Sequence, residues 1–232
     1  MKKIIVTLMV LPFVCSCVFT GFNGFGLGKV VKCKGPVESR AMEIEGEFSA
    51  IEMNGGFDVE LVNADACAVD ITANNDAFDW LQVYTREDGV LVIETKDHVT
   101  LMAEKCDITV SAPAYKSINV NGAVDLEYTY DGDGSEPLSI VVNGAGDMDL
   151  KKFAGPSLDV SVNGAADLDI KELCTKTLNV YINGAGDLKV TGEADDASFT
   201  VNGAGSIDAS GLNLKNEPTI SKQGLADVTL MK

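Results

Sequence analysis

The chain has 232 residues, of which 46% are apolar, so it can bury one sizeable core but is too short for three ordinary domains. Its formal net charge of −17 excludes binding to nucleic acid by neutralisation of phosphates. The same charge excludes electrostatic attraction to anionic lipid, so we expect contact with a membrane only through a covalent anchor.

The first residues, MKKIIVTLMVLPFVCSC, place two lysines before a short apolar run, which is the layout of an export signal. The run is too short to remain in a bilayer as a spanning helix. Its end resembles a bacterial lipoprotein signal, in which a small residue precedes the cysteine that becomes lipid-modified. We therefore predict a lipoprotein signal peptide at residues 1–16 and lipidation of Cys17. A simple secretory signal that is cut elsewhere is the alternative.

Residues 17–45 are glycine-rich at first and have no sustained periodicity, so they are predicted to be a tether between the lipid and a folded body at residues 46–232.

Four further cysteines follow Cys17, namely Cys33, Cys67, Cys106 and Cys174. An oxidising compartment permits disulfides, and four cysteines allow three pairings. We expect mostly buried thiols, with Cys67 to Cys106 as the one candidate bridge. The chain has one histidine and no CxxC motif, which argues against a zinc site.

One turn motif recurs along the chain, mostly in its second half. NGAGDMDL begins at residue 143, and related stretches begin at 54, 121, 163, 183, 202 and, in degraded form, 223. The last five intervals are 22, 20, 20, 19 and 21 residues. A repeat of this length indicates a stacked architecture in which each unit contacts mainly its neighbours.

Apolar residues alternate on both sides of each motif, which predicts two strands joined at the Asn-Gly turn. An up-and-down sheet of hairpins is one architecture that fits, because Asn-Gly is a strong hairpin signal. A coil that turns a corner at each Asn and stacks each turn on the one before also fits, and it explains why the turns are so alike. We therefore expect an all-β fold, a right-handed parallel β-helix-like solenoid with rungs of about 20 residues. The part from residue 64 to 116 lacks the repeat and is expected to be more irregular, covering one end.

In such a coil the motif asparagines would lie above one another, about 4.8 Å apart, and each amide could bond to the next. We predict that they form a structural ladder inside the corner, with the following glycines adopting backbone angles that other residues avoid. The ladder residues are Asn54, Asn121, Asn143, Asn163, Asn183 and Asn202.

Acidic residues stand four and six places after most of these asparagines, and the alternation turns them outward in two stripes. The candidate acidic binding face consists of Asp125, Asp147, Asp149, Asp167, Asp169 and Asp187. A calcium-binding surface, a catalytic pair of carboxylates and a solvated face are the three interpretations. Neighbouring charges about 5 Å apart repel by only about 0.8 kcal/mol in water, so the stripes need no metal to exist. We expect no metal, no cofactor and no catalytic residue.

Two regions resemble the bacterial family of putative auto-transporter adhesins with a head GIN domain. They are the stretch from FSAIEMNGGFDVEL to DGVLVIET and the later NGAGD repeats, which together run over about residues 46–232. The resemblance implies an exported, often lipid-anchored protein built from stacked β-strands. It implies no set of functional residues that could be transferred to this chain.

These observations predict a non-catalytic binding or adhesion module of the bacterial envelope, an outer-membrane lipoprotein facing the periplasm or the surface. The expected partner is a glycan or an envelope or host protein, and the alternative is a polysaccharide-cleaving enzyme that uses the clustered aspartates.

Overall fold

The computed structural model describes residues 29–130, 132 and 134–231. The predicted signal peptide and Cys17 lie outside these residues. The described chain is built from strands, with two three-residue 3₁₀ turns, η1 (Asn75–Ala77) and η2 (Lys96–His98), and contains no α-helix. The all-β prediction is therefore confirmed. No helix of this described part is long and apolar enough to cross a membrane.

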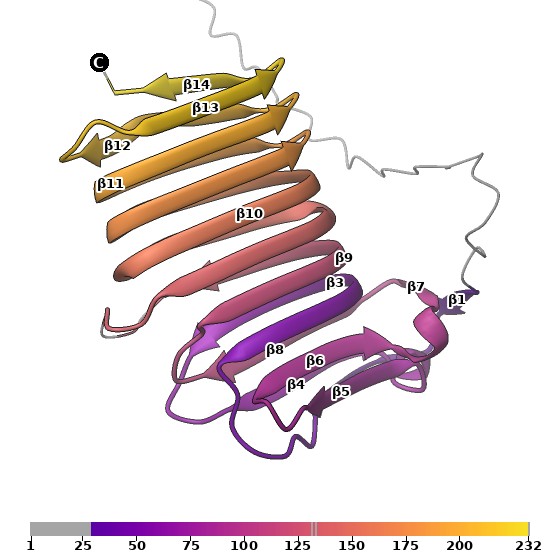
Figure 1. Ribbon diagram of the computed structural model, residues 1–232. Helices are drawn as coiled ribbons and strands as arrows, with labels where there is room; N and C mark the ends of the chain where they lie inside the picture. The colour runs from indigo at the N-terminus through magenta and orange to yellow at the C-terminus, as the bar shows by residue number, and fades with distance from the viewer. Residues whose placement is uncertain (1–28, 131, 133, 232) are drawn as a thin grey trace, which may run out of the picture.

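The strands fall into a mixed N-terminal part and a repetitive remainder (Figure 1). The first part holds β1 (Val30–Cys33), β2 (Val37–Ala41), β3 (Ala50–Asn63), β4 (Ala68–Asn74), β5 (Leu81–Thr85), β6 (Val90–Thr95), β7 (Thr100–Ala103) and β8 (Cys106–Ala112). The second holds β9 (Ser117–Thr129), β10 (Leu138–Gly184), β11 (Asp187–Gly203), β12 (Ser206–Leu214), β13 (Thr219–Gly224) and β14 (Asp227–Leu230).

Successive repeats pair in parallel and in register. Asn121 lies opposite both Asn54 and Asn143, and Asn202 lies opposite both Asn183 and Gln223. Hairpins would pair consecutive strands antiparallel, so the hairpin architecture is wrong for this part of the chain. Figure 1 shows the result as a stack of turns that winds away from β3, with β10 alone passing through several of them.

The alternation predicted the core of these turns correctly. From β9 to β12 every expected inward residue is buried, from Ile118 and Val120 to Ile207 and Ala209. Phe199 and Tyr128 are among the largest side chains that are fully buried. Val228 and Leu230 in the last strand are only partly buried, because β14 has a neighbour on one side, β12, in the described chain.

Two glycines show why the turn sequence repeats so closely. Gly144 has φ +154° and Gly164 has φ +152°, a region that favours glycine. A Cβ on Gly144 would lie 1.9 Å from the carbonyl oxygen of Gly122, and one on Gly164 would lie 1.9 Å from that of Gly144. Each turn therefore approaches the turn before it more closely than any side chain allows.

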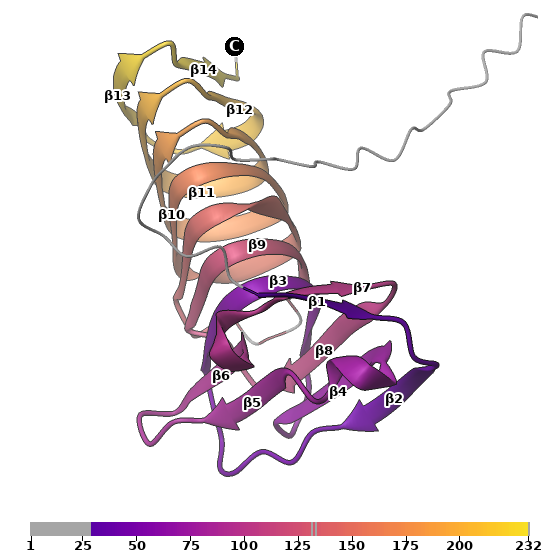
Figure 2. The ribbon, with the colours of Figure 1, turned by 90° about the vertical axis from the view of Figure 1, so that its right-hand side faces the viewer.

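The N-terminal part covers one end of the stack (Figure 2). It contains antiparallel pairs, β2 with β4, β4 with β8, and β5 with β6. The predicted tether to residue 45 is wrong for residues 30–41, because β1 pairs with β7, β2 pairs with β4, and Cys33 is buried. Short, isolated strands of this kind leave no periodic signal in the sequence.

The candidate bridge between Cys67 and Cys106 is also wrong, since both thiols are free, as are those of Cys33 and Cys174. Cys67 precedes Ala68, which pairs with Ser111, whereas Cys106 pairs with Ala73. The two cysteines thus lie at opposite ends of the β4–β8 pair, about 20 Å apart at the usual rise per residue, and a disulfide requires less than about 7 Å between the Cα atoms.

Candidate functional site

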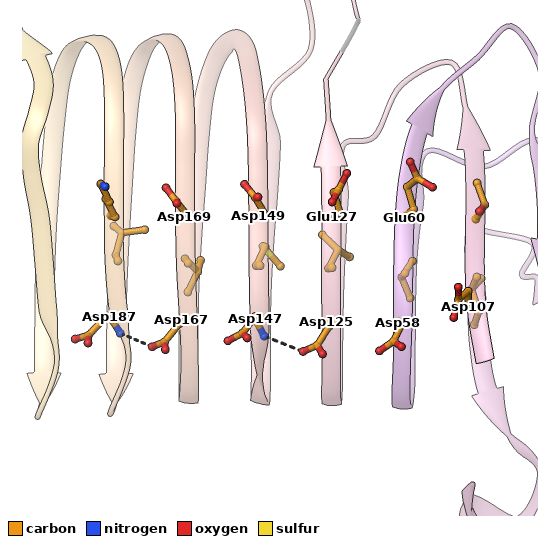
Figure 3. A pocket seen from close by; sticks show the side chains of 18 of the residues that line it. Asp58, Glu60, Asp107, Asp125, Glu127, Asp147, Asp149, Asp167, Asp169 and Asp187 are labelled. Atoms are coloured by element: carbon orange, nitrogen blue, oxygen red, sulfur yellow. Dashed lines mark hydrogen bonds between the residues drawn. The ribbon is translucent and has the colours of Figure 1, made fainter. Parts of the chain in front are cut away.

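An open groove of about 820 Å³ runs along the stack, on the strands that follow the Asn-Gly corner. It extends from β8 and β3 across β9, β10 and β11 to β12. Figure 3 shows its labelled acidic side chains in two parallel rows, with one residue of each row on each turn from Asp58 to Asp169. All six residues of the predicted acidic face line this one groove.

The two rows differ in composition, and we name them separately. The Asp row consists of Asp58, Asp125, Asp147, Asp167 and Asp187. The mixed row consists of Glu60, Glu127, Asp149, Asp169 and Lys189. The rows stand two residues apart along each strand, and the buried residue between them, such as Leu126, Met148 or Leu168, holds the strand against the core.

Lysines neutralise much of the mixed row. Lys171 Nζ lies 3.2 Å from Asp149 Oδ1 and 3.1 Å from Asp169 Oδ2, and Lys151 pairs with Glu127. Hydrogen bonds to Asp169 and Asp149 raise the pKa of Lys171. These lysines occur two residues after an aspartate of the row, a signal that is present in the sequence but that the repeat alignment did not single out.

The Asp row has no ion pair among the described residues. Its carboxylates instead accept backbone N–H groups of the next turn. Asp147 N donates to Asp125 Oδ1 at 3.2 Å, and Asp187 N donates to Asp167 Oδ1 at 3.1 Å. These two bonds are drawn in Figure 3. The row ends at Ser206, whose backbone N–H and hydroxyl both donate to Asp187 Oδ1, at 3.0 and 2.7 Å.

The unpaired charges of the Asp row affect one another. Burial raises the pKa of Asp147, and the neighbouring Asp125 and Asp167 raise it further. The pKa of Asp58 is raised in the same way, by burial and then by Asp125 and Asp107, although Lys105 opposes the shift. A cation placed over this row would relieve that repulsion, so the row is the part of the groove that favours a positively charged ligand.

Asp107 is a groove residue that the sequence did not predict. It lies on β8, outside the repeats, and enters the groove because β8 pairs with β3 in a register that sets Asp107 opposite Asp58. Only the spatial pairing of these two strands reveals it. Asp58, Glu60 and Glu127 belong to the predicted stripes and also line the groove.

The predicted Asn ladder differs from its expected position. Asn121, Asn143 and Asn163 each donate a side-chain hydrogen bond to the Asn of the preceding turn, at 2.9, 3.0 and 3.1 Å. Their side chains are exposed, so the ladder does not lie inside the corner. Asn202 donates to the hydroxyl of Tyr181 instead, at 3.1 Å, so it does not continue the series.

The groove's chemistry is that of a charged surface. Among the described residues no group of three or more His, Cys, Asp or Glu side chains is arranged to hold a metal ion. Glycoside hydrolysis requires two carboxylates in different environments on either side of the bond. In the Asp row the raised pKa values of Asp58 and Asp147 have the same cause, and each turn repeats the surroundings of the last.

Comparison with known proteins agrees with this architecture. The model of a family described as "Putative auto-transporter adhesin, head GIN domain" matches residues 47–231. No curated protein is significantly similar to the chain.

Three solved bacterial structures share the fold at low sequence identity. A protein of Parabacteroides distasonis described as a "putative lipid binding protein" is 17% identical, with a TM-score of 0.63 over 88% of this chain and 100% of its own. A "putative adhesin" of Bacteroides fragilis is 15% identical, with a TM-score of 0.64 over 87% and 100%. Another, from Parabacteroides distasonis, is 19% identical, with a TM-score of 0.63 over 86% and 84%.

Proposed function

The chain belongs to the family described as "Putative auto-transporter adhesin, head GIN domain", and from this we propose that it is a non-catalytic binding protein of the bacterial cell envelope. We further propose that its stacked turns form a right-handed parallel β-helix with rungs of about 20 residues. The parallel, in-register pairs between repeats support this geometry.

The proposed contact surface is the acidic groove, and the proposed partner is an extended basic segment of an envelope or host protein. The single observation that carries this proposal is the Asp row, whose five carboxylates form no ion pair with any described lysine or arginine, while Lys151 and Lys171 pair with the adjacent mixed row. An extended chain laid along the groove would meet one carboxylate per turn, about every 4.8 Å. The attraction between the basic side chains of the partner and the Asp row would decrease as the salt concentration rises, because salt screens the charges.

Anchoring belongs to the same proposal. We propose that residues 1–16 are removed as a lipoprotein signal and that the lipid on Cys17 holds the protein at the outer membrane, facing the periplasm or the surface. The sequence MKKIIVTLMVLPFVCSC supports this. Replacing Cys17 with Ala would then move the protein from the membrane fraction to the soluble periplasmic fraction, and an unchanged distribution would contradict the anchor.

Binding to the groove is tested by fluorescence anisotropy with a labelled decalysine peptide, at low and at high salt. Labelled decaglutamate is the control peptide of opposite charge. We expect decalysine to bind, with an affinity that falls as salt rises, and decaglutamate not to bind. The variant Asp147→Asn/Asp167→Asn should weaken decalysine binding about tenfold, since each partly screened charge contributes up to about 1 kcal/mol.

The matched control is Asp65→Asn/Asp88→Asn, which makes the same change in net charge at exposed positions that do not line the groove. It should leave decalysine binding within about twofold of the parent protein. Equal losses in the two double variants would mean that only net charge matters and would refute the groove. New reducing ends released from polysaccharides by the unaltered protein would instead support the enzyme alternative.

A further inference from the structure

A second face of the stack differs in charge from the groove. It lies on the strand segments before the Asn-Gly corner and consists of the side chains two and four residues before the six motif residues from Asn121 to Gln223, that is, from Ser117 and Asn119 to Thr219 and Ser221. We call it the neutral face. One of its twelve residues, Asp159, is charged, whereas ten of the twelve at the corresponding groove positions are charged. In a chain with a net charge of −17, so long an uncharged face is distinctive.

The neutral face is hollowed at its centre. A depression of about 320 Å³ crosses several turns there, and its polar lining residues are Ser139, Asp159, Ser161, Asn179, Tyr181, Ser198 and Thr200. The register sets Tyr181 opposite Thr200 and Asn179 opposite Ser198. Hydroxyl and amide groups therefore recur from turn to turn along the length of the hollow.

Two hydrogen bonds orient the larger side chains of the hollow. Asn179 Nδ2 donates to Asp159 Oδ1 at 2.7 Å, which engages the only carboxylate of the face. Asn202 Nδ2 donates to the Tyr181 hydroxyl at 3.1 Å, so this hydroxyl accepts from the protein and keeps its own proton for a ligand. The Tyr181 side chain is 39% exposed, which leaves ring surface open to contact.

The chemistry of the face selects one class of ligand. It has no lysine or arginine to bind phosphate, sulfate or carboxylate groups, and the net charge of the protein repels polyanions. Its apolar surface is limited to Tyr181 and the half-buried Val141, which is too little for a lipid. Hydroxyls and amides that both donate and accept, next to an aromatic ring with a polar tip, match a ligand that is uncharged and rich in hydroxyl groups.

We propose that the neutral face binds an uncharged polysaccharide. The ring of Tyr181 stacks on one sugar, and Ser161, Asn179 and Thr200 hydrogen-bond to the hydroxyls of that sugar and its neighbours. Because the turns repeat, a polymer of repeated sugars meets similar groups at successive turns, as extended ligands do on other stacked folds. This site lies on the other side of the Asn-Gly corner from the groove, shares no lining residue with it and does not depend on the groove's ligand.

The test is affinity electrophoresis in gels that contain a neutral polysaccharide (dextran, mannan, galactomannan or hydroxyethyl cellulose) or an anionic one (hyaluronan). At least one neutral polysaccharide should retard the unaltered protein, equally at low and high salt, and hyaluronan should not. Tyr181→Ala should weaken the interaction about tenfold, and Tyr181→Phe should retain most of it, because the stacking surface remains.

Tyr84→Ala is the matched control, since Tyr84 is 41% exposed on β5, which β6 and β3 separate from the neutral face. It and the groove variant Asp147→Asn/Asp167→Asn should both leave the retardation unchanged. The proposal is overturned if no neutral polysaccharide retards the protein, if Tyr84→Ala has the same effect as Tyr181→Ala, or if the groove variant abolishes the retardation. Each of these results is independent of the decalysine assay, so the failure of this proposal can be told apart from the failure of the proposed groove function.

Discussion

The N-terminal part and the repeated turns are stabilised in different ways. In the N-terminal part each contact is made once. The Asn74 side chain is buried, donates to Gly35 O at 2.7 Å and accepts the backbone N–H groups of Glu104 and Lys105 at 2.9 and 3.1 Å. It thereby joins three distant segments. In the repeated turns the same contact recurs, such as each Asn-Gly corner lying against the corner before it.

This difference means that the two regions have different roles: the N-terminal part covers one end of the stack, and the repeated turns present the surfaces. Unique contacts hold the sheet that covers one end of the stack, and they do not arrange the exposed side chains of that sheet in a regular pattern. Repeated contacts place like side chains in columns, and the columns form both the acidic groove and the neutral face. A substitution should therefore cost most where backbones approach closely or a buried contact is unique, and least where an exposed contact is one of a series.

The largest loss is expected at the close approach between turns. Gly164→Ala places a Cβ against the Gly144 carbonyl at a positive φ, so we expect the free energy of unfolding to fall by about 3–5 kcal/mol. Urea denaturation measures this. Gly56→Ala is the control, because its Cβ would meet nothing nearer than 3.5 Å, and it should change stability by less than about 1 kcal/mol. Similar values for both variants would contradict the stacking geometry.

A smaller loss is expected at the unique contact of the N-terminal part. Asn74→Ala leaves a carbonyl and two N–H groups without their partner, which should lower the free energy of unfolding by about 2–4 kcal/mol. The same urea titration applies. A loss below 1 kcal/mol would mean that these buried groups find other partners.

The exposed Asn series should matter less still. Asn143→Ala removes one donor and one acceptor of a chain of exposed amides, so we expect a loss of about 0.5–1 kcal/mol. A loss as large as that of Asn74→Ala would show that the series acts as one cooperative unit and would remove the distinction between unique and repeated contacts.

The smallest effect concerns pH. The pKa values of Asp58 and Asp147 are raised in the folded state, so their ionised forms destabilise it, and stability should rise as pH falls from 7 toward 4 and these groups take up protons. Asp76 and Asp208, whose pKa values are lowered, lose their contribution mainly below this range. Asp147→Asn should raise the melting temperature slightly at pH 7 and flatten its rise toward pH 4. A parent protein whose melting temperature falls over that range would contradict the repulsion in the Asp row.

The sequence predicted the features of the structure that recur in every turn, but it did not predict the contacts that occur only once. The alternation around each Asn-Gly turn gave the buried residues from Ile118 to Ala209 and the six aspartates of the groove, because a period of two fixes which way a side chain points. It missed the strands within residues 30–41, the separation of Cys67 from Cys106 and the entry of Asp107, since each depends on the pairing of strands distant in sequence. It also placed the asparagines inside the corner, where their exposed amides do not lie.

The pairing of Lys151 and Lys171 with the mixed row was neither predicted nor hidden from the sequence. Both residues are visible in the sequence, but their effect appears only when neighbouring turns are in register, since Lys171 reaches Asp149 of the preceding turn. The contrast between a neutralised row and an unpaired row therefore required the structure.

In-register stacking of the turns is the claim on which both surfaces depend, and distances between spin labels test it most directly. Cysteines introduced at the exposed corner positions Ala123, Ala204 and Leu225, after the native cysteines have been replaced, would carry the labels in pairs. Four and five turns separate the two later positions from Ala123, so the account predicts backbone separations of about 19 Å and about 24 Å, increasing by one strand spacing per turn. Separations that do not increase in this way, or that are broadly distributed, would contradict the account.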